Sequence, residues 1–304
     1  MIASASPPLT AGDMLTLAEL RYLQRVSGLR GIALVAHAWI TIAAAMIVYA
    51  VWPSPLTLVA AIAVIGGRQF GLAVLMHEAA HWRLFRHPKS NDLIARRLCA
   101  CPVGAELSSY RRRHYLHHRH TGQAEDPDLG LGAPFPVARA TFWWSVVRDL
   151  SGVTAGARAV EACRRYESAS AAWRRLRGPV AVNLVLLGAL GALGQWRLYV
   201  LLWALPLVTW FQLLTRIRNL AEHALTPGTE DPLRNTRTVM AGFLARLLVA
   251  PYWVNYHLEH HLFVFVPCWK LRAARTLLLA KGYGARMETA TGYGDVIRRV
   301  TAAG

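Results

Sequence analysis

Four apolar stretches, arranged in two pairs, restrict the folds open to this chain more than any other feature. The first two cover about residues 31–51 and 56–76 and are separated only by WPSP. The second two cover about 179–193 and 196–214, with GQW near their junction. Each approaches the roughly 20 residues that cross a bilayer as a helix, although the third is short. The pattern predicts two transmembrane helical hairpins.

Basic residues predict how these hairpins are oriented. Of the 34 lysines and arginines, all but Arg68 and Arg197 lie outside the two hairpins. Loops rich in lysine and arginine stay in the cytoplasm, so we expect both hairpin tips to face away from it. A net charge of +17 also occurs in nucleic-acid-binding proteins. No recognised nucleic-acid-binding motif accompanies the charge here, so we expect a membrane partner and no nucleic acid.

Histidine is concentrated in short segments that all fall on the predicted cytoplasmic side. They read HEAAH from residue 77, HYLHH from 114 and HLEHH from 257, with NLAEH from 219 after the fourth stretch. On a helix, residues three or four positions apart share a face, so each segment is expected to direct its side chains toward a common point. The side chains are His77, His81, His114, His117, His118, Asn219, His223, His257, His260 and His261.

Nine imidazoles indicate a metal centre with more than one ion. One four-coordinate zinc ion cannot use them all, whereas two ions of higher coordination number can. Imidazole binds iron, zinc and copper, so the ligand type leaves the metal open. Five carboxylates lie in or near the segments, where we expect either hydrogen bonds to ligand imidazoles or ordinary surface pairing. They are Glu78, Glu222, Glu259, Asp126 and Asp128.

Two other functions compete with a multinuclear centre. HEAAH is also an HExxH motif, in which Glu78 would be the general base of a zinc metalloprotease. That interpretation leaves seven clustered histidines unexplained. A metal transporter would place its ligands at bilayer depth, whereas these segments lie beyond the ends of the predicted spans. About two irons per chain favours the multinuclear centre, and one zinc favours the protease.

The order of the segments resembles the membrane fatty acid desaturase and hydroxylase superfamily. That family has an HxxxH box after its second span, an HxxHH box soon after, and a final HxxHH box beyond the fourth. NLAEH resembles its additional NxxxH element, whose histidine binds metal and whose asparagine contacts the metal through water. HHRHTGQAEDPD and NYHLEHHLFVFVP are similar to the acyl-lipid desaturase branch, except at Val264, where that branch often has proline. The resemblance covers roughly residues 30–285.

The resemblance implies two iron ions, with dioxygen as co-substrate. The nine histidines would bind the ions, Asn219 would act through water, and no catalytic residue is expected beyond the ligands. The implied reaction introduces a double bond into a fatty acyl chain of a lipid. A hydroxylase or a carotenoid-modifying oxygenase of the same superfamily is the alternative. Electrons would come from a separate ferredoxin or cytochrome with its reductase, because the sequence shows no flavin, iron-sulfur or haem-binding motif. His120 lies outside the implied ligand set.

We therefore expect an all-α, multi-pass integral membrane protein. Its four transmembrane helices would form two hairpins, and a cytoplasmic helical cap would carry the histidine boxes. Residues 1–29 are predicted to be a cytoplasmic N-terminal tail, 30–285 the membrane domain and 286–304 a C-terminal tail. Residues 238–256 are predicted to form an interfacial helix, because a fifth span would put His257 on the wrong side. Arg68 is expected either to pair internally or to face a partner.

Overall fold

The computed structural model describes residues 9–131, 135–164, 166–227 and 231–302. Residues 1–8 of the predicted N-terminal tail, and residues 303–304, lie outside the described residues. Within those ranges four helical segments are long and apolar enough to cross a membrane. They are α3 (Gly28–Val51), α4 (Pro55–Ala80), α9 (Ala169–Ala192) and the continuous segment Trp196–His223. The prediction of four transmembrane helices is confirmed as far as the length and composition of the helices are concerned.

The first two of these helices pack against each other and are joined by only three residues. Ser54 ends the connection, and its hydroxyl accepts a hydrogen bond from the Thr57 amide at 3.1 Å, which caps α4. Pro55 follows at the first helical position, where its missing N–H costs nothing. The second half of α4 is almost wholly buried. It therefore forms the centre of the molecule, and its last turn carries HEAAH.

The third helix begins ten residues earlier than the apolar pattern indicated. Ser168 caps α9, with its hydroxyl accepting from the Ala171 amide at 3.2 Å, and Pro179 lies inside the helix. Residues 173–177 read WRRLR, so hydropathy alone set the start too late. The fourth segment is built from α10 (Trp196–Leu198), the π-helix η4 (Tyr199–Ala204), α11 (Leu205–Val208) and α12 (Trp210–His223).

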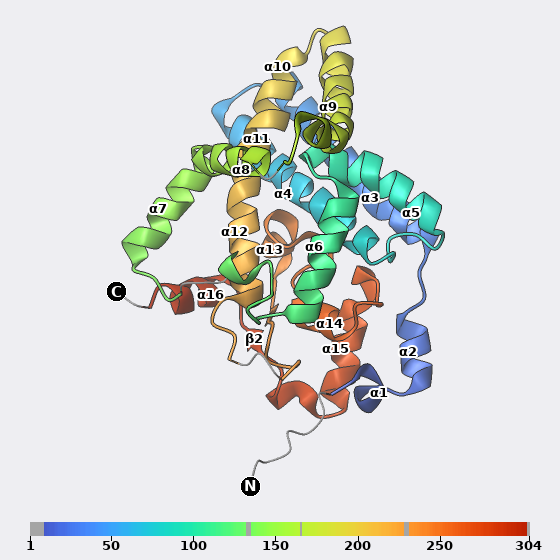
Figure 1. Cartoon of the computed structure of the whole chain (residues 1–304). Helices are drawn as coiled ribbons and strands as arrows, with labels where there is room; N and C mark the ends of the chain where they lie inside the picture. The colour runs from blue at the N-terminus through green and yellow to red at the C-terminus, as the bar shows by residue number, and fades with distance from the viewer. Residues whose placement is uncertain (1–8, 132–134, 165, 228–230, 303–304) are drawn as a thin grey trace.

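Short elements surround these long helices. Figure 1 shows α9 and α10 at one end of the molecule and α14 and α15 toward the other, with α12 between them. The remaining elements are α1 (Ala11–Met14), α2 (Leu17–Leu23), α5 (Pro88–Ile94), η1 (Ala95–Ala100), η2 (Cys101–Val103), α6 (Leu107–His120), η3 (Leu129–Leu131), α7 (Arg139–Leu150), α8 (Val153–Arg164), β1 (Thr238–Val239), α13 (Phe243–Leu248), η5 (Pro251–Trp253), α14 (His257–Leu262), η6 (Cys268–Lys270), α15 (Leu271–Ala280), η7 (Tyr283–Ala285), β2 (Thr289–Ala290) and α16 (Tyr293–Val300).

The segment 238–256 is not the single interfacial helix that the sequence suggested. It contains β1, the six-residue helix α13 and the turn η5, and Tyr252 there has a φ of 53°. Arg68 explains part of this shape, because its guanidinium donates to the Leu247 carbonyl at 2.5 Å. Arg68 is 3% exposed, and its partner is this carbonyl inside the protein. The segment adds no fifth span among the described residues.

The predicted C-terminal tail contains two ordered elements. Strand β2 pairs in parallel with β1, through Thr238 with Thr289 and Val239 with Ala290. Helix α16 packs against α12. Its Val300 is fully buried in a small apolar cluster that also includes Leu220 of α12. The tail residues therefore support the end of α12 that carries NLAEH.

Replacing Gly31 with alanine is expected to lower the free energy of unfolding by about 1–3 kcal/mol, the usual cost of overpacking. A Cβ at Gly31 would overlap the Leu84 carbonyl oxygen and lie 3.0 Å from the Phe85 ring. Gly28→Ala is the matched control on α3, because a Cβ there meets nothing within 4 Å. Thermal unfolding of the detergent-solubilised variants measures the difference. Equal midpoints for the two would contradict the close packing of α3 on residues 84–85.

Candidate metal centre

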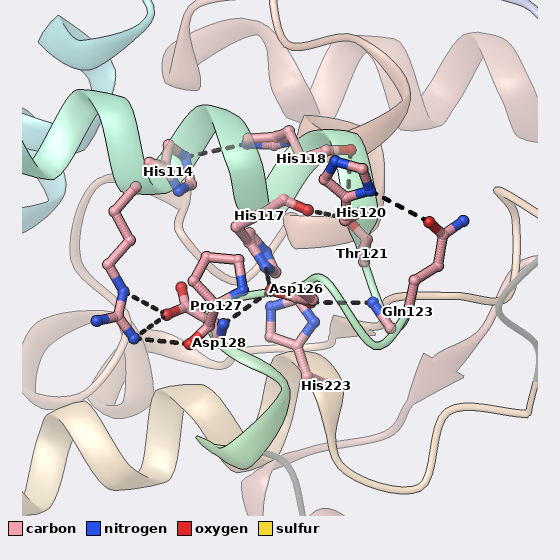
Figure 2. Close-up of polar contacts among 12 residues, drawn as sticks. His114, His117, His118, His120, Thr121, Gln123, Asp126, Pro127, Asp128 and His223 are labelled. Atoms are coloured by element: carbon pink, nitrogen blue, oxygen red, sulfur yellow. Dashed lines mark hydrogen bonds and ion pairs between the residues drawn. The ribbon is translucent and has the colours of Figure 1, made fainter.

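Four elements carry the nine histidines to one region. His77 lies in the last turn of α4 and His81 directly follows that helix. Helix α6 begins at Leu107 because the Glu106 carboxylate accepts hydrogen bonds from the Ser108 and Ser109 amides at 2.9 and 2.7 Å. Its last two turns hold three of the nine, His114, His117 and His118, which Figure 2 shows along one stretch of the helix. The end of α12 and the helix α14 supply the others.

The structure places these imidazoles in two groups rather than at one point. One group contains His77, His81, His114, His118 and His260, and the other contains His117, His223, His257 and His261. In each group, one ring nitrogen from every member lies within 4.8 Å of the others. The expectation of a common point for each box was therefore wrong for α6 and α14, which both contribute to both groups.

Helix geometry explains the division. Successive residues turn by about 100°, so a residue four positions on lies about 40° around the helix, and a residue three positions on lies about 60° the other way. His114 and His118 consequently share one group while His117 faces the other. On α14, His257 and His261 stay together and His260 faces away from them. The HxxHH spacing thus supplies two sites from one turn of helix.

The spacing of the ring nitrogens fits shared metal ions. The Nε2 atoms of His114 and His118 are 3.0 Å apart, and those of His118 and His260 are 3.1 Å apart. In the second group the Nε2 atoms of His223 and His257 are 3.0 Å apart. Adjacent ligands about 2.1 Å from one ion lie about 3 Å apart when they subtend a right angle. The nitrogens already converge as ligands to a cation do.

Several ring nitrogens in the two groups form no hydrogen bond among the described residues. Both ring nitrogens of His77, and one each of His81, His260 and His261, are buried without a hydrogen bond among the described residues. Burying such groups without a partner is costly. Burial lowers the pKa of His81 to about 3 and holds the pKa of His260 well below its usual range. The rings are therefore neutral, which leaves a lone pair for a metal ion. The donor set fits a resident metal.

Asp126 fixes the orientation of one imidazole. Its carboxylate accepts a hydrogen bond from Nδ1 of His117 at 2.9 Å, and also from the Gly122 and Asp128 amides at 2.9 and 2.8 Å (Figure 2). Nε2 of His117 is then free to act as the ligand atom. Thr121 supports a second ring, because its hydroxyl lies 3.3 Å from Nδ1 of His261.

Replacing Asp126 with asparagine is expected to lower metal affinity or turnover by about 10–100-fold, the usual effect of losing a partner of a ligand histidine. The amide has one acceptor oxygen, whereas three donors converge on the carboxylate. Gln123→Ala is the control, because that exposed side chain contacts His120 and neither histidine group. Metal content after dialysis against a chelator measures the effect. Unchanged retention in the asparagine variant would contradict the assignment.

The other carboxylates have different partners. Oε2 of Glu222 lies 3.4 Å from Nε2 of His257. Glu259 is bound by Thr238 and Arg275. Asp128 pairs with Arg113, and Glu78 accepts from the Cys268 amide at 2.8 Å. Glu78 thus joins α4 to η6 through Oε2, while its Oε1 lies 3.6 Å from Nδ1 of His77. His77 and His81 have three further histidines around them. This arrangement disfavours the metalloprotease interpretation.

Asn219 lies one turn before His223 on α12 and is half-buried. It lines a cavity of about 670 Å³ together with His117, His223 and His257. Its contact with a metal through water remains a prediction. His120, one position beyond the α6 ligands, contacts Gln123 at 3.4 Å and belongs to neither group. The arginines that line the same cavity are functional candidates that the sequence did not single out.

Four apolar helices of membrane-spanning length and two groups of buried or half-buried imidazoles define a helical membrane protein with a candidate metal centre. A family model described as fatty acid desaturase matches residues 50–291, and the chain belongs to that family. It is therefore an enzyme of the desaturase and oxygenase superfamily, as the histidine boxes predicted.

The chain is similar to both desaturases and ketolases. It is 31% identical to a dihydrorhizobitoxine desaturase of Bradyrhizobium elkanii over 74% of this chain and 68% of that protein. It is 28% identical to a beta-carotene ketolase of a Paracoccus species over 73% of this chain and 80% of the relative. A beta-carotene ketolase of Haematococcus lacustris is 28% identical over 68% of this chain and 58% of its own length.

Proposed function

We propose that the protein is a di-iron, dioxygen-dependent membrane oxidoreductase that introduces a double bond into its substrate. The observation that carries this proposal is the division of nine imidazoles, six of them buried and three half-buried, into groups of five and four. The five would hold one iron and the four the other, with Asn219 completing the second through water. When bound, the two ions supply activation of dioxygen and removal of hydrogen from a C–H bond that has no acidic proton.

The chain's own residues position these ligands and admit the substrate. Asp126 holds His117 by its Nδ1 atom, and Thr121 contacts His261. The cavity of about 670 Å³ reaches imidazoles of both groups, so a substrate there would lie beside the centre. Six of the nine rings are buried, which limits the access of water to them. These features support oxidation of a molecule bound within the protein.

Desaturation and oxygenation share this centre. The similarity to a named desaturase supports the first, and the similarity to beta-carotene ketolases makes oxygenation the second candidate. The acyl chain of a lipid, an external ferredoxin or cytochrome donor, the hairpin topology and the cytoplasmic position of the centre remain predictions. The excess of arginine outside the apolar helices supports the cytoplasmic position.

Metal analysis of the purified protein tests the centre. We expect about two iron atoms per chain and loss of both after treatment with a chelator. One zinc per chain would contradict the proposal and revive the HExxH interpretation. Mass spectrometry of metabolites and lipids from cells with and without the gene then tests the reaction. Products two hydrogens lighter support desaturation, whereas hydroxylated or keto products alone would replace it with oxygenation at the same centre.

A further inference from the structure

The cavity beside the second histidine group has an unusual wall for an enzyme that oxidises hydrocarbon chains. It lies among α6, α7, α8 and α12, and its volume falls in the range of small-molecule sites. None of its described lining residues is leucine, isoleucine, valine, methionine, phenylalanine or tryptophan. A site for a purely apolar chain is lined mostly by such side chains. This cavity therefore suits a molecule with a charged or strongly polar group.

The sign of that group follows from the charges on the wall. Three carboxylates line the cavity, against the arginines Arg113, Arg148, Arg158, Arg216 and Arg218. Three of the arginines are already paired with carboxylates, namely Arg113 with Asp128, Arg216 with the fully buried Asp149, and Arg218 with Glu222. Their guanidinium groups are held in place and largely neutralised. They shape the wall more than they attract a ligand.

Arg148 and Arg158 differ from the other three. Among the described residues, neither forms an ion pair with a carboxylate. Arg158 donates to the neutral amide oxygen of Gln212 at 2.7 Å, which directs its guanidinium without cancelling its charge. Asp149, the residue after Arg148, is bound by Arg216 and Thr154. Five arginines and three carboxylates, one of them Glu161, therefore line a cavity that His114, His117, His223 and His257 also line.

A second cavity, of about 430 Å³, shares the lining residues Thr154, Arg158, Arg216 and Asn219 with the first. Its lining includes Phe142, Val137 and Leu220. Arg158 therefore lies at the junction between a polar cavity and a partly apolar one. A molecule with an anionic group and a short carbon skeleton matches this combination.

We propose that the oxidised substrate is held in this cavity by an anionic group, a carboxylate or a phosphate, paired with Arg148 and Arg158. The planar guanidinium group binds both anions through two parallel hydrogen bonds. The inference rests on the proposed function, and it adds an ionic anchor for the substrate. The carbon skeleton then extends from the anchor toward the histidines.

Isothermal titration of the iron-loaded protein in phosphatidylcholine nanodiscs tests the anchor. Hexanoate, hexylamine and hexanol serve as probes of one chain length and different charge. Hexanoate is expected to bind at least about tenfold more tightly than the other two. Arg148→Gln and Arg158→Gln should each weaken hexanoate binding by about tenfold or more, since each removes a charged hydrogen bond. Arg272→Gln, on the exposed side of α15, is the control and should bind as the wild type does.

Nanodiscs containing phosphatidylglycerol identify the source of the anion. If they suppress hexanoate binding, the anchor holds a lipid headgroup, and if they do not, it holds a water-soluble anion. Binding of hexanoate that is equal in the wild type and both cavity variants would overturn the inference, even if the carboxylate binds iron directly. A protein without iron or oxidised product would refute the proposed function alone, because arginine-dependent binding is measured without turnover.

Discussion

Replacing His260 with alanine is expected to remove the iron of the five-histidine group and to lower turnover by more than about 100-fold. Loss of a mere hydrogen-bond partner of a ligand costs 10–100-fold, and loss of the ligand costs more. His260 is 3% exposed, and its Nε2 atom lies 3.1 Å from that of His118. The ring has little structural function, since its Nδ1 atom has no partner among the described residues.

His120→Ala is the matched control, because it removes an imidazole from α6 that belongs to neither group. Both variants are expected to insert into membranes and to elute as the wild type does in size-exclusion chromatography. Iron content should fall from about two atoms per chain to about one in the His260 variant only. Full iron content and turnover in that variant would remove His260 from the ligand set.

Replacing Arg275 with alanine is expected to lower the free energy of unfolding by about 3–5 kcal/mol, because it leaves a buried carboxylate without its counter-charge. Arg275 of α15 donates to Oε1 of Glu259 at 2.7 Å, and the Glu259 side chain is wholly buried. Thr238 of β1 binds the other oxygen. Glu259 lies between the histidines of α14, so the ion pair also holds that helix against the metal centre.

Arg272→Ala is the control for this change. Arg272 lies on the same helix and is exposed, so its replacement is expected to change the free energy of unfolding little. The double variant Arg275→Met with Glu259→Gln should recover part of the stability, since no buried charge remains. Thermal unfolding in detergent gives the comparison. If Arg275→Ala unfolds at the same temperature as Arg272→Ala, the ion pair does not support α14.

The apolar pattern predicted the number of membrane helices but not all their limits. Composition is a good guide where a helix is apolar throughout, as at residues 31–51. It failed at the start of α9, because residues 173–177 are basic and aromatic and the helix is capped earlier, at Ser168. It also failed at residues 238–256, where the carbonyl of Leu247 is bound by Arg68 from a distant helix. Such long-range contacts are invisible in local sequence.

The sequence predicted which histidines form the candidate site but not how they divide into two groups. The spacing of the boxes identified every histidine that the structure brings together. Whether His117 and His118 serve one site or two depends on which neighbours face each side of α6, and that requires the positions of α4, α12 and α14. The sequence spacing of Arg148 and Arg158 gave no indication that they act together, because they lie on two successive helices and line the same cavity only in the fold.

Helices α6 and α14 each contribute histidines to both groups, so the helical repeat sets the spacing between the two groups. No loop intervenes between neighbours such as His117 and His118, so the helix backbone, and not loop motion, sets the separation of the two histidine groups there. A single residue inserted between them would rotate one set of ligands by about 100° relative to the other. An insertion inside a box is therefore expected to separate ligands that the helix holds together.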